Sequence, residues 1–528
     1  MKIKSFYFLL MFFTPFLTSA QYTLDWIQPC GEFNKISVMS VTDDQDNLIV
    51  TGYWQSYQIF TRKYDIDGNF LWEIADSSGM QSLYEKPIWI NCDNNNNIYV
   101  VGKRYAIGSS YEYPDAIVAI KYNPSGTLLW RQIIPITTLI GSSSPGFNLR
   151  SAVDSDGSLY IASMGIIPSG SGFVLAKIST TGTIQYVNVD ATVVATGFAS
   201  MRLKDNRVIM TGSAGTQSAA PVAVWDTSGV VVWTALGNGA GGHDVETDDA
   251  WNVYLFTSSP NQVSSSSLQD MVLYKYDNSG AQIWKRSYDF NGQDFPTRMT
   301  LVNNKISAIG WGTNGTTSPY FDWKTFQTDT SGNLLWSNFY NGTIYNDEYP
   351  ANLVATPTGE VIVTGVGGPS PLPSQSLSYI QLIILEYNNT GSQVWIDTPN
   401  VYGGSGLACM LASDNSLFAI SYYNMTAYHY EPSALGLTDA QIQNPDGIFC
   451  YPNPAKGTAM LNFQLEKEQV VSVSVVNAVG SLVMNIPNEK RSQGHNTIPI
   501  DLSAFKPGIY FCHLKTETGM RAVKVIKD

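Results

Sequence analysis

One short pattern recurs through most of the chain. An Asp or Asn residue is usually followed three residues later by a glycine, and a tryptophan stands four residues beyond that glycine. The glycines of the seven copies lie about 54 residues apart on average; they are Gly68, Gly126, Gly182, Gly229, Gly280, Gly332 and Gly391. The third copy has Tyr186 in place of the tryptophan. A period of this length is typical of a repeat architecture in which each copy folds as one supersecondary unit.

A second element precedes each copy: a tight turn rich in Asp, Asn and Gly, followed by a short apolar stretch. Eight such elements begin at residues 46, 96, 156, 206, 251, 304, 358 and 414. In the second unit, the two elements predict strands over 88–92, 98–101, 116–122 and 127–133. A four-stranded sheet has two faces to bury, so we expect neighbouring sheets to stack radially and close into a ring. The sequence therefore predicts an all-β fold, mainly a β-propeller.

The number of blades depends on how the ends of the repeat region are used. Eight turn-and-strand elements are present, but only seven are followed by the glycine pattern. Residues 22–26 end in Trp26 and have the character of the missing outer strand. We expect them to pair with the strand near residues 426–430 and so close the ring within one blade. Eight blades are favoured, and seven are the alternative if the third unit is not a full blade.

The repeats resemble the bacterial β-propeller repeats called SBBP repeats. The resemblance rests on the elements Asp-x-x-Gly-Asn-hydrophobic-Tyr-Val-x-Gly and Lys-Tyr-Asp-x-x-Gly-x-x-x-Trp, and it spans about residues 22–431. It implies the propeller fold and says little about activity, because propellers host many functions.

The N-terminus predicts export. Lysines stand at positions 2 and 4, residues 6–17 are almost wholly apolar, and Thr18-Ser19-Ala20 supplies the small residues at which a signal peptidase cuts. No later stretch reaches the roughly 20 apolar residues of a transmembrane helix. The expected organisation is a signal peptide over 1–20, a propeller over 21–431, a linker over 432–447 and a separate domain over 448–528.

The last domain has its own character. About seven short strands are expected in it, which suits a small Ig-like β-sandwich. Its marked residues, in a Tyr-Pro-Asn-Pro opening, a Val-x-Asn-x-x-Gly turn and a Leu-x-x-Phe-x-x-Gly-Ile-Tyr segment, are Pro452, Asn453, Pro454, Gly480, Gly508 and Tyr510. With the Lys-Val-Ile-Lys ending, they resemble the type A C-terminal sorting domain of the type IX secretion system. An ordinary Ig-like adhesive module is the alternative.

The sorting-domain resemblance implies particular partners and a location. These are the type IX secretion machinery and its signal peptidase, in a Bacteroidota-type cell. The domain would be removed after export through the periplasm and outer membrane, and the protein would be secreted or held at the cell surface.

Charge and cysteine content exclude some functions. The net charge of −13 and pI of 4.8 argue against nucleic-acid binding, which needs a basic surface. The five cysteines show no metal-ligand spacing; they are Cys30, Cys92, Cys409, Cys450 and Cys512. Cys450 and Cys512 fall in the same domain, either as a disulfide or, more simply, as two buried thiols.

The propeller region offers little for catalysis. His243 and His429 are its only histidines, and no nucleophile, phosphate-loop or metal motif is present. Residues 65–69 and 154–157 resemble fragments of calcium loops, but both lack the distal glutamate of an EF-hand. Hairpin turns explain both segments, and the sequence favours a non-enzymatic protein.

Acidic residues recur just before the first strand of several units: Glu32, Glu85, Asp244, Asp294 and Glu348. The connections that carry them emerge on one face of a propeller, so these residues are expected to form a partial acidic ring. The ring is either a solvated rim or a site for a polyhydroxylated ligand or a cation, and calcium is the one cofactor that this pattern suggests.

These features together favour an exported binding module for an extracellular glycan or protein. The alternative is a secreted polysaccharide hydrolase or lyase, which needs paired carboxylates about 5–10 Å apart.

Overall fold

The structure is a computed structural model, and it describes residues 22–527 except for a set of gaps. The gaps are 30–34, 55–57, 77–82, 107–113, 137–147, 168–169, 191, 193–194, 215–218, 261–268, 314–320, 342–347, 368–380, 400–405, 422–425, 433–448, 452–454, 456, 466, 478–480 and 517–518. The chain forms two compact units, Met1–Ser433 and Ala434–Asp528. The predicted signal peptide and most of the predicted linker lie outside the described residues.

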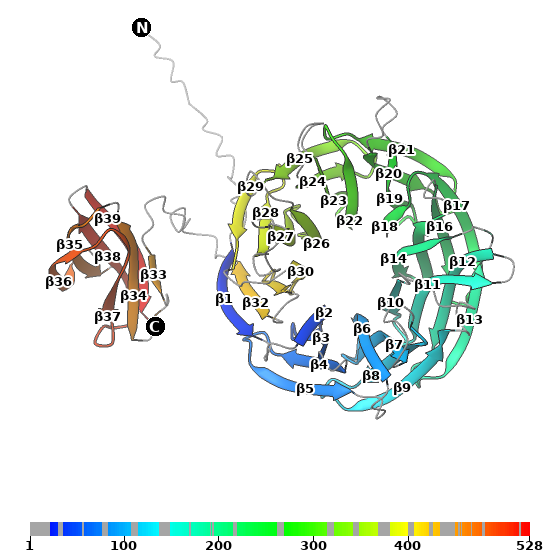
Figure 1. The fold of residues 1–528 in the computed structure, drawn as a ribbon, viewed down its shortest axis with the longest axis horizontal. Helices are drawn as coiled ribbons and strands as arrows, with labels where there is room; N and C mark the ends of the chain where they lie inside the picture. The colour runs from blue at the N-terminus through cyan, green and yellow to red at the C-terminus, as the bar shows by residue number, and fades with distance from the viewer. Residues whose placement is uncertain are drawn as a thin grey trace, which may run out of the picture. The chain divides into compact units, whose positions relative to one another are not determined.

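The first unit is a β-propeller of eight four-stranded antiparallel sheets. Its strands are β1 (Tyr22–Pro29), β2 (Lys35–Thr42), β3 (Leu48–Trp54), β4 (Ile59–Tyr64), β5 (Phe70–Asp76), β6 (Leu83–Cys92), β7 (Ile98–Ala106), β8 (Ala116–Tyr122), β9 (Leu128–Pro135), β10 (Leu149–Val153), β11 (Leu159–Ile167), β12 (Gly170–Ile178), β13 (Ile184–Asp190), β14 (Gly197–Lys204), β15 (Arg207–Ser213), β16 (Ala219–Asp226), β17 (Val231–Asn238), β18 (Gly242–Thr247), β19 (Val253–Pro260), β20 (Gln269–Tyr276), β21 (Gln282–Tyr288), β22 (Asp294–Val302), β23 (Lys305–Thr313), β24 (Phe321–Asp329), β25 (Leu334–Tyr340), β26 (Tyr349–Ala355), β27 (Val361–Gly367), β28 (Gln381–Tyr387), β29 (Gln393–Asp397), β30 (Gly406–Leu411), β31 (Leu417–Ser421) and β32 (Thr426–Pro432). The first strand of each repeat lies nearest the axis and the last lies outermost (Figure 1).

The ring closes as predicted, by joining both ends of the propeller in one blade. Strand β1 pairs antiparallel with β32, and Leu24 lies opposite Tyr430. The Trp26 ring stacks on His429, with ring centroids 5.3 Å apart. The weak third unit is a full blade of strands β10–β13, so the eight-blade expectation is confirmed.

The recurring glycine and tryptophan form the contact between neighbouring blades. Gly280 has a φ of 87°, and a Cβ there would lie 2.8 Å from the ring of Trp233 in the preceding blade. The same relation joins Gly68 to Trp26, whose Nε1 also donates to the carbonyl of Ile66 at 2.8 Å. The repeat therefore encodes how one blade seats on the next, and the apolar core clusters of the propeller pack at these seams.

The glycine that ends the second repeat element has a different role. The inner strand of most blades carries a β-bulge, as between Pro296 and Arg298 of β22. A Cβ on Gly310 of β23, opposite that bulge, would lie 2.2 Å from the carbonyl oxygen of Phe295. Only glycine allows the two backbones to approach so closely.

Antiparallel alternation gives the propeller two unlike faces. On one, the turn face, short hairpins such as 277–281 join the first strand to the second and the third to the fourth. The opposite face, the loop face, holds the end of each second strand, the start of each third strand and the start of the next blade's first strand. The starts of β20, β22 and β24 lie at the loop face because these strands run in the same direction.

The second unit is a small β-sandwich. Its seven described strands are β33 (Phe449–Tyr451), β34 (Thr458–Leu465), β35 (Gln469–Asn477), β36 (Leu482–Arg491), β37 (Gly494–Asp501), β38 (Gly508–Thr516) and β39 (Gly519–Lys527). They form sheets of three and four strands around one apolar core. The predicted all-β fold with an Ig-like sandwich after the propeller is confirmed.

Candidate functional site

Three of the predicted acidic residues hold equivalent places at the loop face. Glu85, Asp294 and Glu348 each stand two residues before the proline at the bulge of an inner strand. Asp244 differs, because it follows the bulge of β18 and so corresponds in register to Arg298. Glu32 lies outside the described residues. The expected equivalence of Asp244 with the other acids was therefore wrong, because a bulge shifts the register in a way that spacing alone does not reveal.

Glu85 and Asp244 are buried against arginines. Both carboxylate oxygens of Glu85 accept hydrogen bonds from Arg131 Nη2, at 2.5 and 2.6 Å. Asp244 lies 3.2 Å from Arg202 Nη2 and also accepts from the hydroxyl of Ser200 at 2.5 Å. Such bonded ion pairs hold a carboxylate in place and compensate its lost hydration.

Asp294 and Glu348 are buried as well, at 0% and 1% exposure. Lys324 Nζ lies 2.8 Å from Asp294 Oδ1, and the Phe290 amide donates to Asp294 Oδ2 at 2.9 Å. Burial and then the charge of Glu348 raise the pKa of Tyr340. The four acids thus lie inside the protein among different neighbours, which differs from a solvated acidic rim.

The two calcium-loop-like segments are hairpin turns at the turn face. Asp65 accepts from the backbone and side-chain amides of Asn69. Asp154 accepts from the Ser158 amide and the Tyr160 hydroxyl. Their carboxylates close their own turns, as in other blades.

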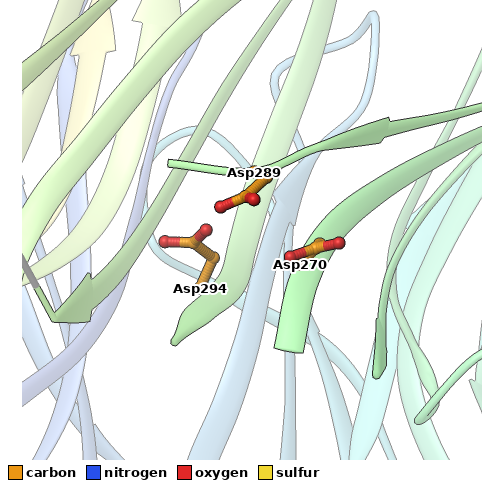
Figure 2. A group of neighbouring side chains, drawn as sticks. All are labelled: Asp270, Asp289 and Asp294. Atoms are coloured by element: carbon orange, nitrogen blue, oxygen red, sulfur yellow. The ribbon is translucent and has the colours of Figure 1, made fainter. Parts of the chain in front are cut away.

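A different group of acids gathers at the loop face, in the seam between the β18–β21 and β22–β25 blades (Figure 2). Asp270 is the second residue of β20, Asp289 directly follows β21, and Asp294 opens β22. One oxygen from each carboxylate lies within 4.8 Å of the others. Asp270 is 6% exposed, and its Oδ1 is buried without a hydrogen-bond partner. Burial, followed by the charges of Asp289 and Asp294, raises the pKa of Asp270 to about 6.

An aromatic cluster occupies the next seam along the same face. Phe295 and Trp311 stack with centroids 4.1 Å apart, and Phe321 lies edge-on to Trp311 at 4.7 Å. Tyr349, from the following blade, packs against Trp311 at 5.3 Å. All four rings are partly exposed, unlike the buried Trp323 beside Trp311 in register.

Sequence reasoning singled out only Asp294 among the residues of these two groups. Asp270 and Trp311 stand near strand ends where the residue type varies from repeat to repeat, with Ala116 and Asp322 in the place of Asp270 in two other blades. A comparison of single repeats therefore does not mark either residue as functional. The contacts that these residues make across blade seams depend on how the strands of neighbouring blades are aligned. The sequence of a single repeat does not contain that information.

The two propeller histidines lie in packed surroundings. Burial lowers the pKa of His243 to about 4, which keeps its imidazole neutral at pH 7. His429 is 1% exposed, and its Nδ1 lies 3.1 Å from an oxygen of Asp25. Neither histidine is placed with a nucleophile among the described residues.

In the sandwich, Tyr510 joins the core, and its hydroxyl donates to the carbonyl of Lys506 at 2.8 Å. Gly508 opens β38, whereas Pro452, Asn453, Pro454 and Gly480 lie outside the described residues. Cys450 and Cys512 are buried free thiols, and hydrogen bonding to Cys512 together with burial raises the pKa of Cys450.

The comparisons with known proteins address the two units separately. Residues 450–528 match the family described as the secretion system C-terminal sorting domain. The structure titled Dos1 propeller aligns with a TM-score of 0.51 at 11% identity, over 78% of this chain and 95% of that one. Sqt1 from Chaetomium thermophilum aligns with a TM-score of 0.48 at 9% identity, over 78% and 100%. At such identity, the likeness to Dos1 shows the fold alone.

No curated protein matches the chain significantly. Within the described part, no helical segment has the length and apolarity needed to cross a bilayer. The chain is thus a β-propeller followed by a type IX sorting domain, which implies export and a cell-surface or secreted location. The finer resemblance of the blades to SBBP repeats stays a prediction.

Proposed function

We propose that this protein is an exported, non-enzymatic binding module whose loop face binds an extracellular glycan. The sorting domain at residues 450–528 supports delivery by type IX secretion, with its machinery and signal peptidase as partners. The observation that carries the binding role is the partly exposed aromatic cluster around Trp311.

Aromatic rings of this kind suit a sugar ligand. A sugar ring presents C–H groups on its faces and hydroxyls at its edge, so its face packs on an aromatic ring while its hydroxyls need polar partners. Phe295 and Trp311 lie on paired strands, which fixes their rings without ligand. Such preorganisation lowers the entropic cost of binding.

The arrangement of the acids favours binding over hydrolysis. In glycoside hydrolases two carboxylates stand about 5–10 Å apart on either side of the scissile bond. Asp270, Asp289 and Asp294 instead gather in one blade seam, where one oxygen of each lies within 4.8 Å of the others. Glu85 and Asp244 are each paired with an arginine. A secreted polysaccharide hydrolase or lyase remains the alternative.

Affinity electrophoresis of the mature protein in gels containing plant, algal or microbial polysaccharides tests this proposal. We expect at least one polysaccharide to retard the protein, and Trp311→Ala to abolish the retardation. Trp251→Ala is the matched control, because Trp251 is a partly exposed tryptophan at the turn face, under the guanidinium of Arg207. No retardation by any polysaccharide, or equal retardation of the Trp311 variant, would reject the glycan site. Release of reducing or unsaturated sugars would favour the enzyme.

The export part of the proposal has a separate test. Deletion of residues 448–528 should leave the propeller in the periplasm of a cell with type IX secretion, because the sorting domain is a separate compact unit. Immunoblots of periplasm, cell surface and medium would show the change. Arrival of the truncated protein in the medium would contradict type IX delivery without bearing on glycan binding.

A further inference from the structure

We propose that Asp270, Asp289 and Asp294 bind a calcium ion in the seam between the β18–β21 and β22–β25 blades (Figure 2). This inference goes beyond the proposed glycan binding and does not depend on it. The site also differs from the predicted acidic ring, of which it includes Asp294 alone.

The spacing of the three carboxylates fits one ion. Calcium binds oxygen at about 2.3–2.6 Å, so two oxygens on opposite sides of the ion are separated by about 5 Å. One oxygen from each aspartate lies within 4.8 Å of the others, which places all three within reach of a shared centre. The aspartates come from different blade elements, so an ion there would tie the two blades together.

Asp270 gives a second, independent indication of a bound ion, because one of its buried oxygens has no hydrogen-bond partner. It is 6% exposed, and its Oδ1 is buried and accepts no hydrogen bond. A buried carboxylate oxygen without a partner is costly, and few remain so in folded proteins. Asp294 has the amide of Phe290 and the ammonium of Lys324, so the protein's own cation contacts Asp294 and leaves Asp270 unpartnered.

The raised pKa of Asp270 agrees with this geometry. Burial and the charges of Asp289 and Asp294 raise it to about 6. A divalent cation would reverse the effect, because it favours the ionised form of each carboxylate.

The chemistry of the donors selects the ion. The cluster contains only carboxylates and no histidine or cysteine. Oxygen donors of this kind suit hard cations such as calcium, whereas zinc and copper favour nitrogen and sulfur. Asp289 is exposed, which opens the site to solvent, and waters would complete the six to eight ligands that calcium takes. Three ligands from the protein suit an extracellular site with a dissociation constant on the order of 10⁻⁴–10⁻³ M.

Isothermal titration calorimetry of the mature protein with calcium chloride, after treatment with a chelator, measures this binding directly. We expect one site per chain, a rise in melting temperature with about 5 mM calcium, and weaker binding of magnesium, which gives up its water less readily. Asp270→Asn and Asp289→Asn should each weaken calcium binding by about tenfold or more, because each removes one charged ligand.

Asp322→Asn is the matched control. Asp322 holds in β24 the place that Asp270 holds in β20, and it too is buried with an oxygen that lacks a hydrogen-bond partner. It stands outside the aspartate cluster, so its variant should bind calcium like the parent. Absence of a calcium signal in the parent, or unchanged binding in both the Asp270 and Asp289 variants, would overturn the proposal. Asp289 is exposed, so its variant keeps the test valid if Asp270→Asn fails to fold.

The calcium site and the glycan site can fail separately. Trp311→Ala should lose polysaccharide retardation and keep calcium binding, because Trp311 lies in the next seam. Asp289→Asn should lose calcium binding in calorimetry whether or not any polysaccharide binds.

Discussion

Acidic residues have different roles at the two faces of the propeller. At the turn face, Asp277 accepts from the amides of Ser279 and Ala281 in its own hairpin, and equivalent residues do so in other blades. At the loop face, Glu85 pairs with an arginine, Asp294 with a lysine, and Asp270 lacks a partner at one oxygen. The residues of the turn face repeat because every blade must pack on the next in the same way, whereas the residues of the loop face vary from blade to blade. We infer that the binding function lies at the loop face.

The largest effect is expected from breaking the closing blade. A variant that lacks residues 21–29 would lose the β1–β32 ladder and the contact of Trp26 with Ile66 of the next blade. Trp26 is partly buried, so its loss should cost less than the roughly 3–5 kcal/mol of a fully buried tryptophan. The strand ladder is lost with it, and total stability is typically about 5–15 kcal/mol. We expect the propeller to unfold at much lower urea concentration.

Tryptophan fluorescence measures this unfolding, and all 13 tryptophans lie before residue 432. Leu24→Ala is the control, because Leu24 is 40% exposed on the same strand and should cost little. An unchanged urea midpoint in the shortened chain would refute closure by β1.

Two tryptophan substitutions compare the faces directly. Trp336 is 7% exposed and packs on Gly391 of the next blade, whereas Trp311 is partly exposed at the loop face. We expect Trp336→Ala to lower the free energy of unfolding by about 3–5 kcal/mol, and Trp311→Ala by about 1–2 kcal/mol. Urea unfolding gives both values. Equal losses would show that the aromatic cluster is a structural seam like the others.

Gly280→Ala tests whether the turn glycine of the repeat is needed for one blade to pack on the next. Alanine would be strained at a φ of 87°, and its Cβ would lie 2.8 Å from the Trp233 ring. We expect a loss of about 1–3 kcal/mol in urea unfolding. Ser279→Ala in the same turn loses one exposed hydrogen bond to Asp277 and should cost less than about 1 kcal/mol. A neutral Gly280 variant would contradict the role assigned to the repeat.

The sequence predicted the repeated parts of the propeller and the C-terminal sorting domain, but it did not predict the contacts between blades at the loop face. The turn glycines, the outer tryptophans and the closing strand were all found, because each repeats a local constraint. The predicted equivalence of Asp244 was wrong because of a bulge. Asp270 and Trp311 were overlooked because each lies beside a residue of the following blade, Asp294 and Tyr349 respectively. Inter-blade contacts depend on register and on side-chain direction at strand ends, and these follow from the assembled ring.

The smallest effect concerns pH, and here the faces should differ in sign. The pKa of Asp277 is lowered by its hydrogen bond from Ser279, so its contribution to stability is present above pH 4 and is lost as pH falls. The pKa of Asp270 is raised to about 6, above the unfolded value near 4. Its contribution is therefore present below pH 4 and is lost as pH rises through about 6.

The pKa values of other buried acids, such as Asp294 and Asp322, are raised as well by burial, so the informative quantity is a difference between variants. Asp289 and Asp294 raise the pKa of Asp270, and Lys324 offsets the charge of Asp294. Without calcium, Asp270→Asn should melt closer to the parent at pH 5 than at pH 7, where the asparagine removes an unfavourable buried charge; we expect a change below about 2 °C. With calcium at pH 7 the melting temperature of the parent should rise to that of the variant or above it, because the ion stabilises the ionised carboxylate. Melting curves of both proteins at pH 5 and pH 7, with chelator or with calcium, test this prediction. A difference in melting temperature that does not change with pH would show that Asp270 does not titrate between pH 5 and pH 7.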